Sequence, residues 1–251
     1  MPVSDAELGC SHAPLDLSIG AGVPARIAVP IFADVIKVRW ERVMARLGAI
    51  VLAAGTSRRF GAENKLLADF EGEPIVRRLV CQAVSGGIAE ILVVTGHDKE
   101  RITAALENLP VRFTHNANWR SGMGSTIAVG IAALSADVEG VFMVPADMPR
   151  LTSTLFLRLA QIFEENCRSA IVFPTAAGEQ RNPVLWPRRL FPELLKLSGA
   201  SGAKEVLSRY SSESVSIPIE DSRVFDDVDT PEDLWLARCG SNLERMNLLP
   251  K

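Results

Sequence analysis

A loop with two basic residues follows a short apolar run near residue 50. Residues 48–54 are uncharged and Gly55 follows them, which is typical of a buried strand in a parallel sheet. Small residues after a strand let backbone N–H groups approach phosphate oxygens, and Arg59 and Lys65 would add positive charge. The spacing fits neither a P-loop nor a dinucleotide fingerprint. An ordinary tight turn would explain the glycines alone, so the two basic residues lead us to predict a phosphate-binding loop.

A single carboxylate follows a second buried run, residues 140–144. Asp147 lies between Pro145 and Pro149. Mg²⁺ in proteins binds one or two carboxylates together with substrate phosphates. Asp147 could instead cap the helix expected near Thr152, but it lies far upstream and Thr152 would cap that helix better. The sequence therefore favours Asp147 as a Mg²⁺ ligand.

An acidic segment near the C-terminus is a candidate for the second half of this metal site. Thr230 followed by Pro231 indicates a helix start, with Thr230 as the N-cap. Asp229 or Asp227 would then complete the metal site from the loop before that helix. Clustered acids on a loop are usually only solvated, so the segment alone does not decide between these roles.

Short apolar runs alternate with helix-like stretches from Leu47 onward, as in α/β proteins with a parallel sheet. The carboxyl ends of such strands share one edge of the sheet, where ligands bind. We expect strands at 48–54, 91–95, 111–114, 140–144, 170–174, 182–186 and 214–218, and helices at 74–85, 99–109, 125–134, 152–165, 190–197, 203–209 and 231–239.

The order of these motifs resembles the MobA-like nucleotidyltransferases, and within them the molybdenum cofactor cytidylyltransferase branch. The resemblance covers residues 47–237, nearly everything after the N-terminal segment. The motifs that carry it are Leu-Ala-Ala-Gly at 52–55 with Lys65 ten residues on, Gly-Met-Gly-Ser at 122–125, Pro-Ala-Asp-Met-Pro at 145–149, Asn-Pro-Val-Leu at 182–185 and Asp-Val-Asp-Thr-Pro at 227–231.

The resemblance implies a fold and a set of site residues. The fold is α/β, a Rossmann-like three-layer nucleotidyltransferase fold with a mostly parallel central sheet. The residues implied are Leu52, Ala53, Ala54, Gly55, Lys65, Gly96, Gly122 and Ser125 for the nucleotide, Lys65, Arg59 and Asp147 for catalysis, Asp147 and Asp229 for Mg²⁺, and Arg181, Asn182 and Pro183 for the acceptor.

The implied reaction moves CMP from CTP to the terminal phosphate of a molybdopterin-type cofactor and releases pyrophosphate. CTP is favoured because Ala54 stands where members that use GTP have glycine. Two departures from the family pattern, Gln180-Arg181 in place of Arg-Gly and residues 199–204 without the usual aspartate, fall in the part expected to face the acceptor. Alternatives are a sugar or polyol phosphate acceptor, and a non-catalytic cofactor-binding or insertion protein of the same fold.

The amino-acid composition limits the kinds of partner that we expect for this protein. A formal net charge of −3 across 251 residues, with no basic stripe, argues against nucleic-acid binding. The apolar segment 17–36 is interrupted by prolines and charges, so no membrane span is expected. The stretch before it has no basic region and carries Asp5 and Glu7, so no signal peptide is expected. Four scattered cysteines without a C-x-x-C pair argue against a zinc site or a disulfide framework. We expect a cytoplasmic enzyme with reduced thiols, and a molybdoenzyme or its chaperone as a further candidate partner.

Residues 1–46 differ in pattern from the rest of the chain. They mix glycine, proline and alanine with short apolar runs, and the family motifs begin only after them. We expect an N-terminal extension at 1–46 that is poorly ordered or loosely packed, a nucleotidyltransferase domain at 47–240, and a C-terminal tail at 241–251.

Overall fold

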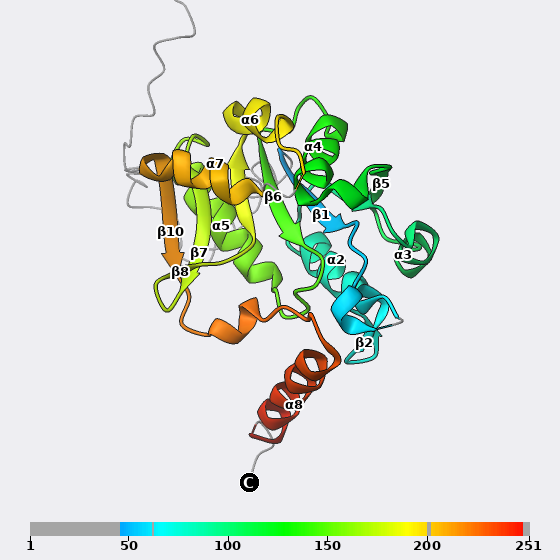
Figure 1. Ribbon diagram of the computed structural model, residues 1–251. Helices are drawn as coiled ribbons and strands as arrows, with labels where there is room; N and C mark the ends of the chain where they lie inside the picture. The colour runs from blue at the N-terminus through cyan, green and yellow to red at the C-terminus, as the bar shows by residue number, and fades with distance from the viewer. Residues whose placement is uncertain (1–45, 62, 200–201, 248–251) are drawn as a thin grey trace, which may run out of the picture. The chain divides into compact units, whose positions relative to one another are not determined.

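A computed structural model describes residues 46–61, 63–199 and 202–247, with side chains as far as residue 239 (Figure 1). The expectation for the N-terminal extension therefore lies outside the described residues, apart from Arg46. The strands are β1 (Leu47–Ala53), β2 (Asp69–Phe70), β3 (Glu73–Pro74), β4 (Glu90–Thr95), β5 (Arg112–His115), β6 (Gly140–Pro145), β7 (Ile171–Ala176), β8 (Glu179–Gln180), β9 (Val184–Pro187) and β10 (Ser214–Pro218).

The α-helices alternate with the strands, and short 3₁₀ turns fill several connections. The α-helices are α2 (Ile75–Ser85), α3 (Lys99–Ala105), α4 (Met123–Ala133), α5 (Ser153–Glu165), α6 (Phe191–Leu195), α7 (Ala203–Arg209) and α8 (Pro231–Asn247). The 3₁₀ turns are η2 (Arg58–Phe60), η3 (Lys65–Leu67), η4 (Trp119–Ser121), η5 (Arg188–Leu190), η6 (Ser211–Glu213) and η7 (Ser222–Phe225).

The main sheet has the order β10-β7-β9-β6-β1-β4-β5, with β8 added alongside β7. The strand β1 lies at its centre and pairs in parallel with both β4 and β6. The strand β9 runs antiparallel to both of its neighbours, β6 and β7. The sheet is therefore mostly parallel, as the sequence predicts.

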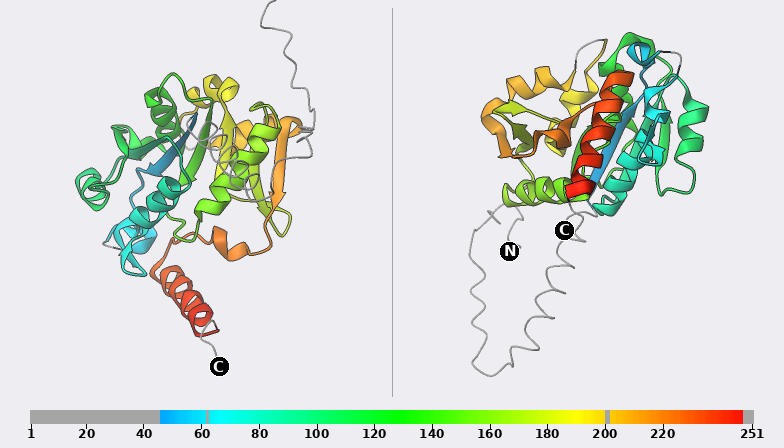
Figure 2. Two further views of the ribbon diagram at one scale, coloured as in Figure 1. Left: turned by 180° about the vertical axis from the view of Figure 1, so that it is seen from behind. Right: turned by 90° about the horizontal axis from the view of Figure 1, so that it is seen from below.

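Helices cover both faces of this sheet, which gives three layers (Figure 2). On one face α2 packs against α3 and α5, and on the other α4 packs against α6. Alternation along β1 and β6 explains the division. Ile50 and Met143 join the core beneath α4, whereas Phe142 meets Phe156 of α5 edge-on at 5.2 Å between ring centroids.

Three elements differ from the sequence prediction. The helix α3 ends at Ala105 rather than near residue 109, because Asn108 adopts a φ of 65° that no helix accommodates. The helix α8 continues to Asn247, past Gly240, since one interior glycine costs a helix only about 1 kcal/mol. The hairpin of β2 and β3 has two-residue strands, too short for any periodic signal.

Within the described ranges, no helix is long and apolar enough to cross a membrane. The cysteines partly contradict the sequence prediction. Cys81 and Cys239 are free thiols, but Cys167 is disulfide-bonded. The expectation of reduced thiols is therefore wrong for Cys167.

Candidate functional site

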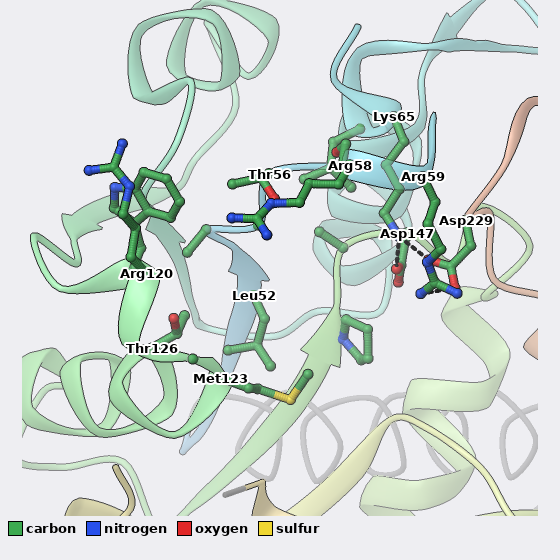
Figure 3. A pocket seen from close by; sticks show the side chains of 18 residues that line it. Leu52, Thr56, Arg58, Arg59, Lys65, Arg120, Met123, Thr126, Asp147 and Asp229 are labelled. Atoms are coloured by element: carbon green, nitrogen blue, oxygen red, sulfur yellow. Dashed lines mark hydrogen bonds and ion pairs between the residues drawn. The ribbon is translucent and has the colours of Figure 1, made fainter. Parts of the chain in front are cut away.

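Lys65 is the centre of a charged cluster at the carboxyl edge of the sheet (Figure 3). Its Nζ donates to Oδ2 of Asp147 at 2.5 Å and to Oδ1 of Asp229 at 2.6 Å. The Arg59 guanidinium lies 2.7 Å from the other oxygen of Asp229. The Lys65 side chain is only 14% exposed, whereas that of Arg59 is 74% exposed. Lys65 is thus the inner cation of the cluster and Arg59 the outer one.

A buried contact joins the two loops that carry the carboxylates. Asp147 follows β6 and Asp229 precedes α8. The backbone N–H of Val228 donates to the carbonyl of Asp147 at 2.9 Å. Val228 is fully buried, and it packs with Phe70 of β2 and Ile75 of α2. The small hairpin that the sequence does not reveal therefore forms part of the support for Asp229.

The start of α8 fixes Asp229 from its other side. The Asp233 carboxylate accepts from the backbone N–H groups of Asp229, at 3.1 Å, and Thr230, at 2.8 Å. In return the Thr230 hydroxyl accepts from the backbone N–H of Asp233 at 3.2 Å. This reciprocal pair is a capping box with Pro231 at the first helical position, which confirms Thr230 as the N-cap.

Asn64 holds the loop that carries Lys65. Its side-chain oxygen accepts from the backbone N–H of Leu66 and from the Ser57 hydroxyl, both at 3.0 Å. Its amide group donates to Asp98, at the start of α3, at 3.2 Å. Asn64 is almost fully buried, so the loop between β1 and η3 is tied to the neighbouring β4–α3 connection.

The cluster changes the acidity of its members. Burial alone would lower the pKa of Lys65, but Asp147 and Asp229 outweigh burial and raise that pKa above its ordinary value. Burial, together with the charges of Asp147 and Asp229, raises the pKa of Asp227. Lys65 thus remains a cation at neutral pH.

A cavity of about 520 Å³ opens beside this cluster. The β1 loop forms its floor through Leu52, Ala54 and Gly55. The charged cluster lies at one end, and Arg120 lies at the opposite end (Figure 3). A cavity with small residues at the end of a central parallel strand, and cations at both ends, suits a phosphorylated ligand.

The far wall of the cavity rests on a buried amide. Asn116 donates to the hydroxyls of Ser125 at 2.9 Å and Thr126 at 3.0 Å, and it accepts from the backbone N–H of Asn118 at 2.9 Å. These bonds fix the turn that carries Trp119. The Arg120 guanidinium stacks over the Trp119 ring at 4.4 Å from its centroid.

Gly96 allows β4 to approach that wall. A Cβ at position 96 would lie 2.6 Å from the Cβ of Trp119 and 2.7 Å from the carbonyl oxygen of Ala54. We expect Gly96→Ala to lower the free energy of unfolding by about 1–3 kcal/mol, because Trp119 and the backbone of Ala54 must shift to admit the methyl group. Urea denaturation measures the change. Gly55→Ala is the control, since no atom lies within 4 Å of the added Cβ there, and an equal loss in both variants would contradict the prediction.

A second cavity, of about 640 Å³, adjoins the first. Leu52, Met123 and Pro145 line both cavities and form a shared wall. Arg181 and Asn182 line the second cavity only. Two compounds could therefore bind side by side and meet at the carboxyl ends of β1 and β6.

Residues 49–215 match the family described as MobA-like NTP transferase domain. The chain belongs to the MobA-like NTP transferase family. The match spans well over half of the chain and includes the strands β1, β6 and β9, which contribute lining residues to the two cavities. This transferase is therefore a nucleotidyltransferase, and the sequence-based resemblance to the MobA-like family is confirmed.

Curated relatives of the transferase carry several activities in their names. Nicotine blue oxidoreductase of Paenarthrobacter nicotinovorans is 26% identical over 191 residues, covering 74% of this chain and 93% of that protein. The molybdenum cofactor cytidylyltransferase of Escherichia coli is 22% identical, covering 78% and 97%. A probable molybdenum cofactor guanylyltransferase of Natronomonas pharaonis is 29% identical, covering 75% and 95%.

Solved structures confirm the fold. The Rv0371c protein of Mycobacterium tuberculosis superposes with a TM-score of 0.68 at 20% identity, covering 77% of this chain and 97% of that one. A complex of Rv0371c with manganese superposes with a TM-score of 0.63 at 20% identity, covering 76% and 97%. Their common three-layer architecture is the one described above.

The sequence-predicted site residues divide between the two cavities and their supports. Those that line the first cavity are Leu52, Ala54, Gly55, Arg59, Lys65, Gly122, Asp147 and Asp229. Ala53 and Gly96 lie behind the lining, and the Ser125 hydroxyl bonds to the carbonyl of Gly122 at 2.9 Å. Pro183 follows a cis peptide bond beside the second cavity. Their assigned roles remain predictions.

Several lining residues escaped the sequence analysis. Arg58 adjoins the predicted Arg59, and Trp119 with Arg120 precede the Gly122 motif. Trp186 and Lys204 line the second cavity. The pair of basic residues in the glycine loop could have predicted Arg58 as a lining residue. The aromatic residue just before the glycine motif could have predicted Trp119 and Arg120.

Proposed function

We propose that this transferase moves CMP from CTP to the terminal phosphate of a molybdopterin-type cofactor and releases pyrophosphate. The observation that carries the proposal is the pair of cavities that share Leu52, Met123 and Pro145. Transfer between two bound phosphates requires the attacking oxygen to lie in line with the bond that breaks. Adjoining cavities with the Lys65 cluster at their edge support that arrangement.

The transfer requires positioned phosphates and stabilisation of their negative charge more than it requires a general base. An oxygen of the acceptor phosphate forms a bond to the α-phosphorus of CTP, and the bond from that phosphorus to the β-phosphate oxygen breaks. The acceptor phosphate is already anionic, so no side chain has to remove a proton. Lys65 would stabilise the charge that develops on the phosphates, as preorganised cations do in such reactions.

Asp147 and Asp229 are the proposed ligands of Mg²⁺. Both carboxylates lie within 2.6 Å of one nitrogen, so their oxygens converge on a volume the size of a single ion. Mg²⁺ in proteins is typically bound by one or two carboxylates, with water and substrate phosphate as its other ligands. When bound, Mg²⁺ would neutralise charge on the triphosphate. Manganese in the Rv0371c complex supports a divalent ion in this fold.

The lining of the second cavity supports a ring-shaped, anionic acceptor. Ile127, Met143 and Trp186 give it an apolar surface, and Lys204 and Arg181 are cationic, although Arg181 pairs with Glu179 of the same lining at 2.8 Å. A pterin-like ring with a terminal phosphate matches this combination, because the apolar side chains can contact the ring and Lys204 can contact the phosphate. The proposal makes a cytoplasmic molybdoenzyme or its chaperone the recipient of the product.

The deciding experiment is a panel of the four NTPs with molybdenum cofactor as acceptor and pyrophosphate release as the readout. We expect release only with cofactor present, and fastest with CTP. Release with a sugar or polyol phosphate but not with the cofactor would overturn the acceptor assignment. Faster release with GTP would overturn the base assignment.

We expect Ala54→Gly to relax base selection towards GTP. The Ala54 side chain lines the nucleotide cavity against Gly96, so its removal enlarges the pocket by one methyl group. A methyl group in a pocket is worth about 10-fold or more in discrimination. The ratio of kcat/KM for CTP to that for GTP is the measurement, and a ratio equal to that of the wild type would assign base choice to other residues.

A further inference from the structure

The second cavity contains a buried hydrogen-bond donor that no described part of the chain satisfies. Trp186 lines this cavity, and its side chain is almost completely buried, with 1% of the residue exposed. The indole Nε1 of Trp186 makes no hydrogen bond with any described residue. A buried N–H without a partner is costly, and native structures contain few of them. This N–H therefore needs an explanation in terms of function.

Packing alone does not require a tryptophan at position 186. Val184 and Trp186 belong to β9, and both join the apolar core together with Met143 of β6. A phenylalanine would fill most of the same space and would bury no polar atom. An indole adds one donor to a flat apolar surface. Such a side chain suits a partner that is flat and that has a hydrogen-bond acceptor on its edge.

Arg181, which also lines the cavity, supplies a second donor of this kind. Its Nη2 pairs with the Glu179 carboxylate at 2.8 Å. Its Nε is buried and makes no hydrogen bond within the described ranges of the chain. The ion pair with Glu179 thus leaves one N–H of the guanidinium unsatisfied. Two unsatisfied donors in one cavity indicate a ligand that carries more than one hydrogen-bond acceptor.

The cavity has an exposed side and a buried side, which suggests how a ligand would be oriented. Lys204 is exposed and lies in the first turn of α7. A Cβ on Gly202, just before that helix, would lie 3.9 Å from the Sδ of Met123, in the wall shared with the nucleotide cavity. A phosphate bound to Lys204 would therefore lie near the shared wall. The ring of the same molecule would lie toward the buried Trp186.

We propose that the indole N–H of Trp186 donates a hydrogen bond to a carbonyl oxygen on the ring of the acceptor molecule, and that Trp186 thereby selects acceptors with an oxo-substituted ring. This inference rests on the proposed function and names a specificity-determining residue for it. Pterins carry such a ring carbonyl. A site that hydrogen-bonds one substrate group rejects analogues that lack the group, because the donor of the site is then left unpaired. An amino group in place of the carbonyl would bring a donor against a donor.

The test is an NMR titration of the full chain labelled with ¹⁵N in its four tryptophan indoles. The probes are hydroxymethylpterin, its diamino analogue, which has an amino group in place of the ring carbonyl, and inorganic phosphate. Trp186→Phe removes the N–H and identifies its signal. Trp235→Phe is the matched control, because Trp235 is exposed and lines neither cavity. The wild-type titration is informative even if Trp186→Phe is less stable.

We expect the pterin to move the Trp186 indole proton signal downfield, and to bind about 10-fold or more tightly than the diamino analogue. Trp186→Phe should weaken pterin binding by roughly 5–100-fold, as for loss of one hydrogen bond to a buried donor, and should abolish the preference over the analogue. Phosphate affinity should stay within about twofold of the wild type, because the phosphate contacts Lys204 instead. Trp235→Phe should bind all three probes as the wild type does.

Two results would overturn the inference and leave the proposed function standing. One is pterin binding that does not move the Trp186 signal, and the other is an undiminished preference for the pterin in Trp186→Phe. A wild type that binds no pterin would also overturn the inference. Pyrophosphate release with molybdenum cofactor as acceptor then shows separately whether the proposed function fails as well.

Discussion

Lys65→Ala is expected to lower kcat/KM by about 10²–10³-fold, the usual effect of removing one preorganised charge from the transition state. Lys65 is the only cation that contacts both Asp147 and Asp229 among the described residues, and its side chain is largely buried. No neighbouring cation can take its place, because Arg59 already contacts Asp229 from the exposed side. Pyrophosphate release at varied CTP gives kcat/KM directly.

The same variant should also lose stability when no divalent cation is present. Without Lys65, two partly buried carboxylates face each other with no shared counter-ion, which disfavours the folded state. The melting temperature of Lys65→Ala should therefore fall in EDTA and recover in Mg²⁺. Lys196→Ala, at an exposed ion pair, serves as the control for charge alone. Turnover near that of the wild type would remove Lys65 from the catalytic machinery.

Strand ends explain why part of the site could be predicted from sequence. The motifs at Gly55 and Asp147 each follow a short apolar run, and β1 and β6 pair directly in the sheet. The carboxyl ends of adjacent parallel strands must share one edge. The sequence pattern therefore predicts that the loop and the carboxylate lie side by side.

The direction of β9 could not be predicted in this way. An apolar run near residue 184 indicates a strand but not whether it runs parallel or antiparallel to its neighbours. In the structure Val184 pairs with Met143 and Pro187 pairs with Gly140. The beginning of β9 consequently lies at the edge where β6 ends. This reversal brings Arg181 and Asn182 to the second cavity.

The contacts of individual side chains also could not be predicted from the sequence. Arg58 and Arg59 are adjacent and identical in type, so no pattern says which one contacts a carboxylate. The outcome depends on the 3₁₀ turn after Ser57 and on Asp229, which is 170 residues distant along the chain. Likewise the two-residue hairpin strands that support Val228 carry no periodicity, although they help to fix Asp229.

Asp147→Asn is expected to reduce kcat by about 10²–10³-fold and to raise the Mg²⁺ concentration that gives half-maximal activity. A neutral amide is a poor ligand for Mg²⁺, and metal-derived stabilisation of phosphate charge contributes several kcal/mol to such reactions. The substitution keeps the shape of the side chain, and the backbone bond from Val228 to the carbonyl of residue 147 does not depend on the carboxylate. The fold should therefore be preserved.

The three nearby aspartates make this prediction specific. Asp229→Asn should shift the metal titration in the same direction as Asp147→Asn, because both carboxylates contact Lys65. Asp227→Asn should shift it least, since Asp227 makes no ion pair with Lys65. Activity is measured across Mg²⁺ and Mn²⁺ titrations for all three variants. If Asp147→Asn kept the wild-type metal dependence while Asp227→Asn lost it, the ion would have to be held by the acidic loop before α8, and Asp147 would serve only to orient Lys65.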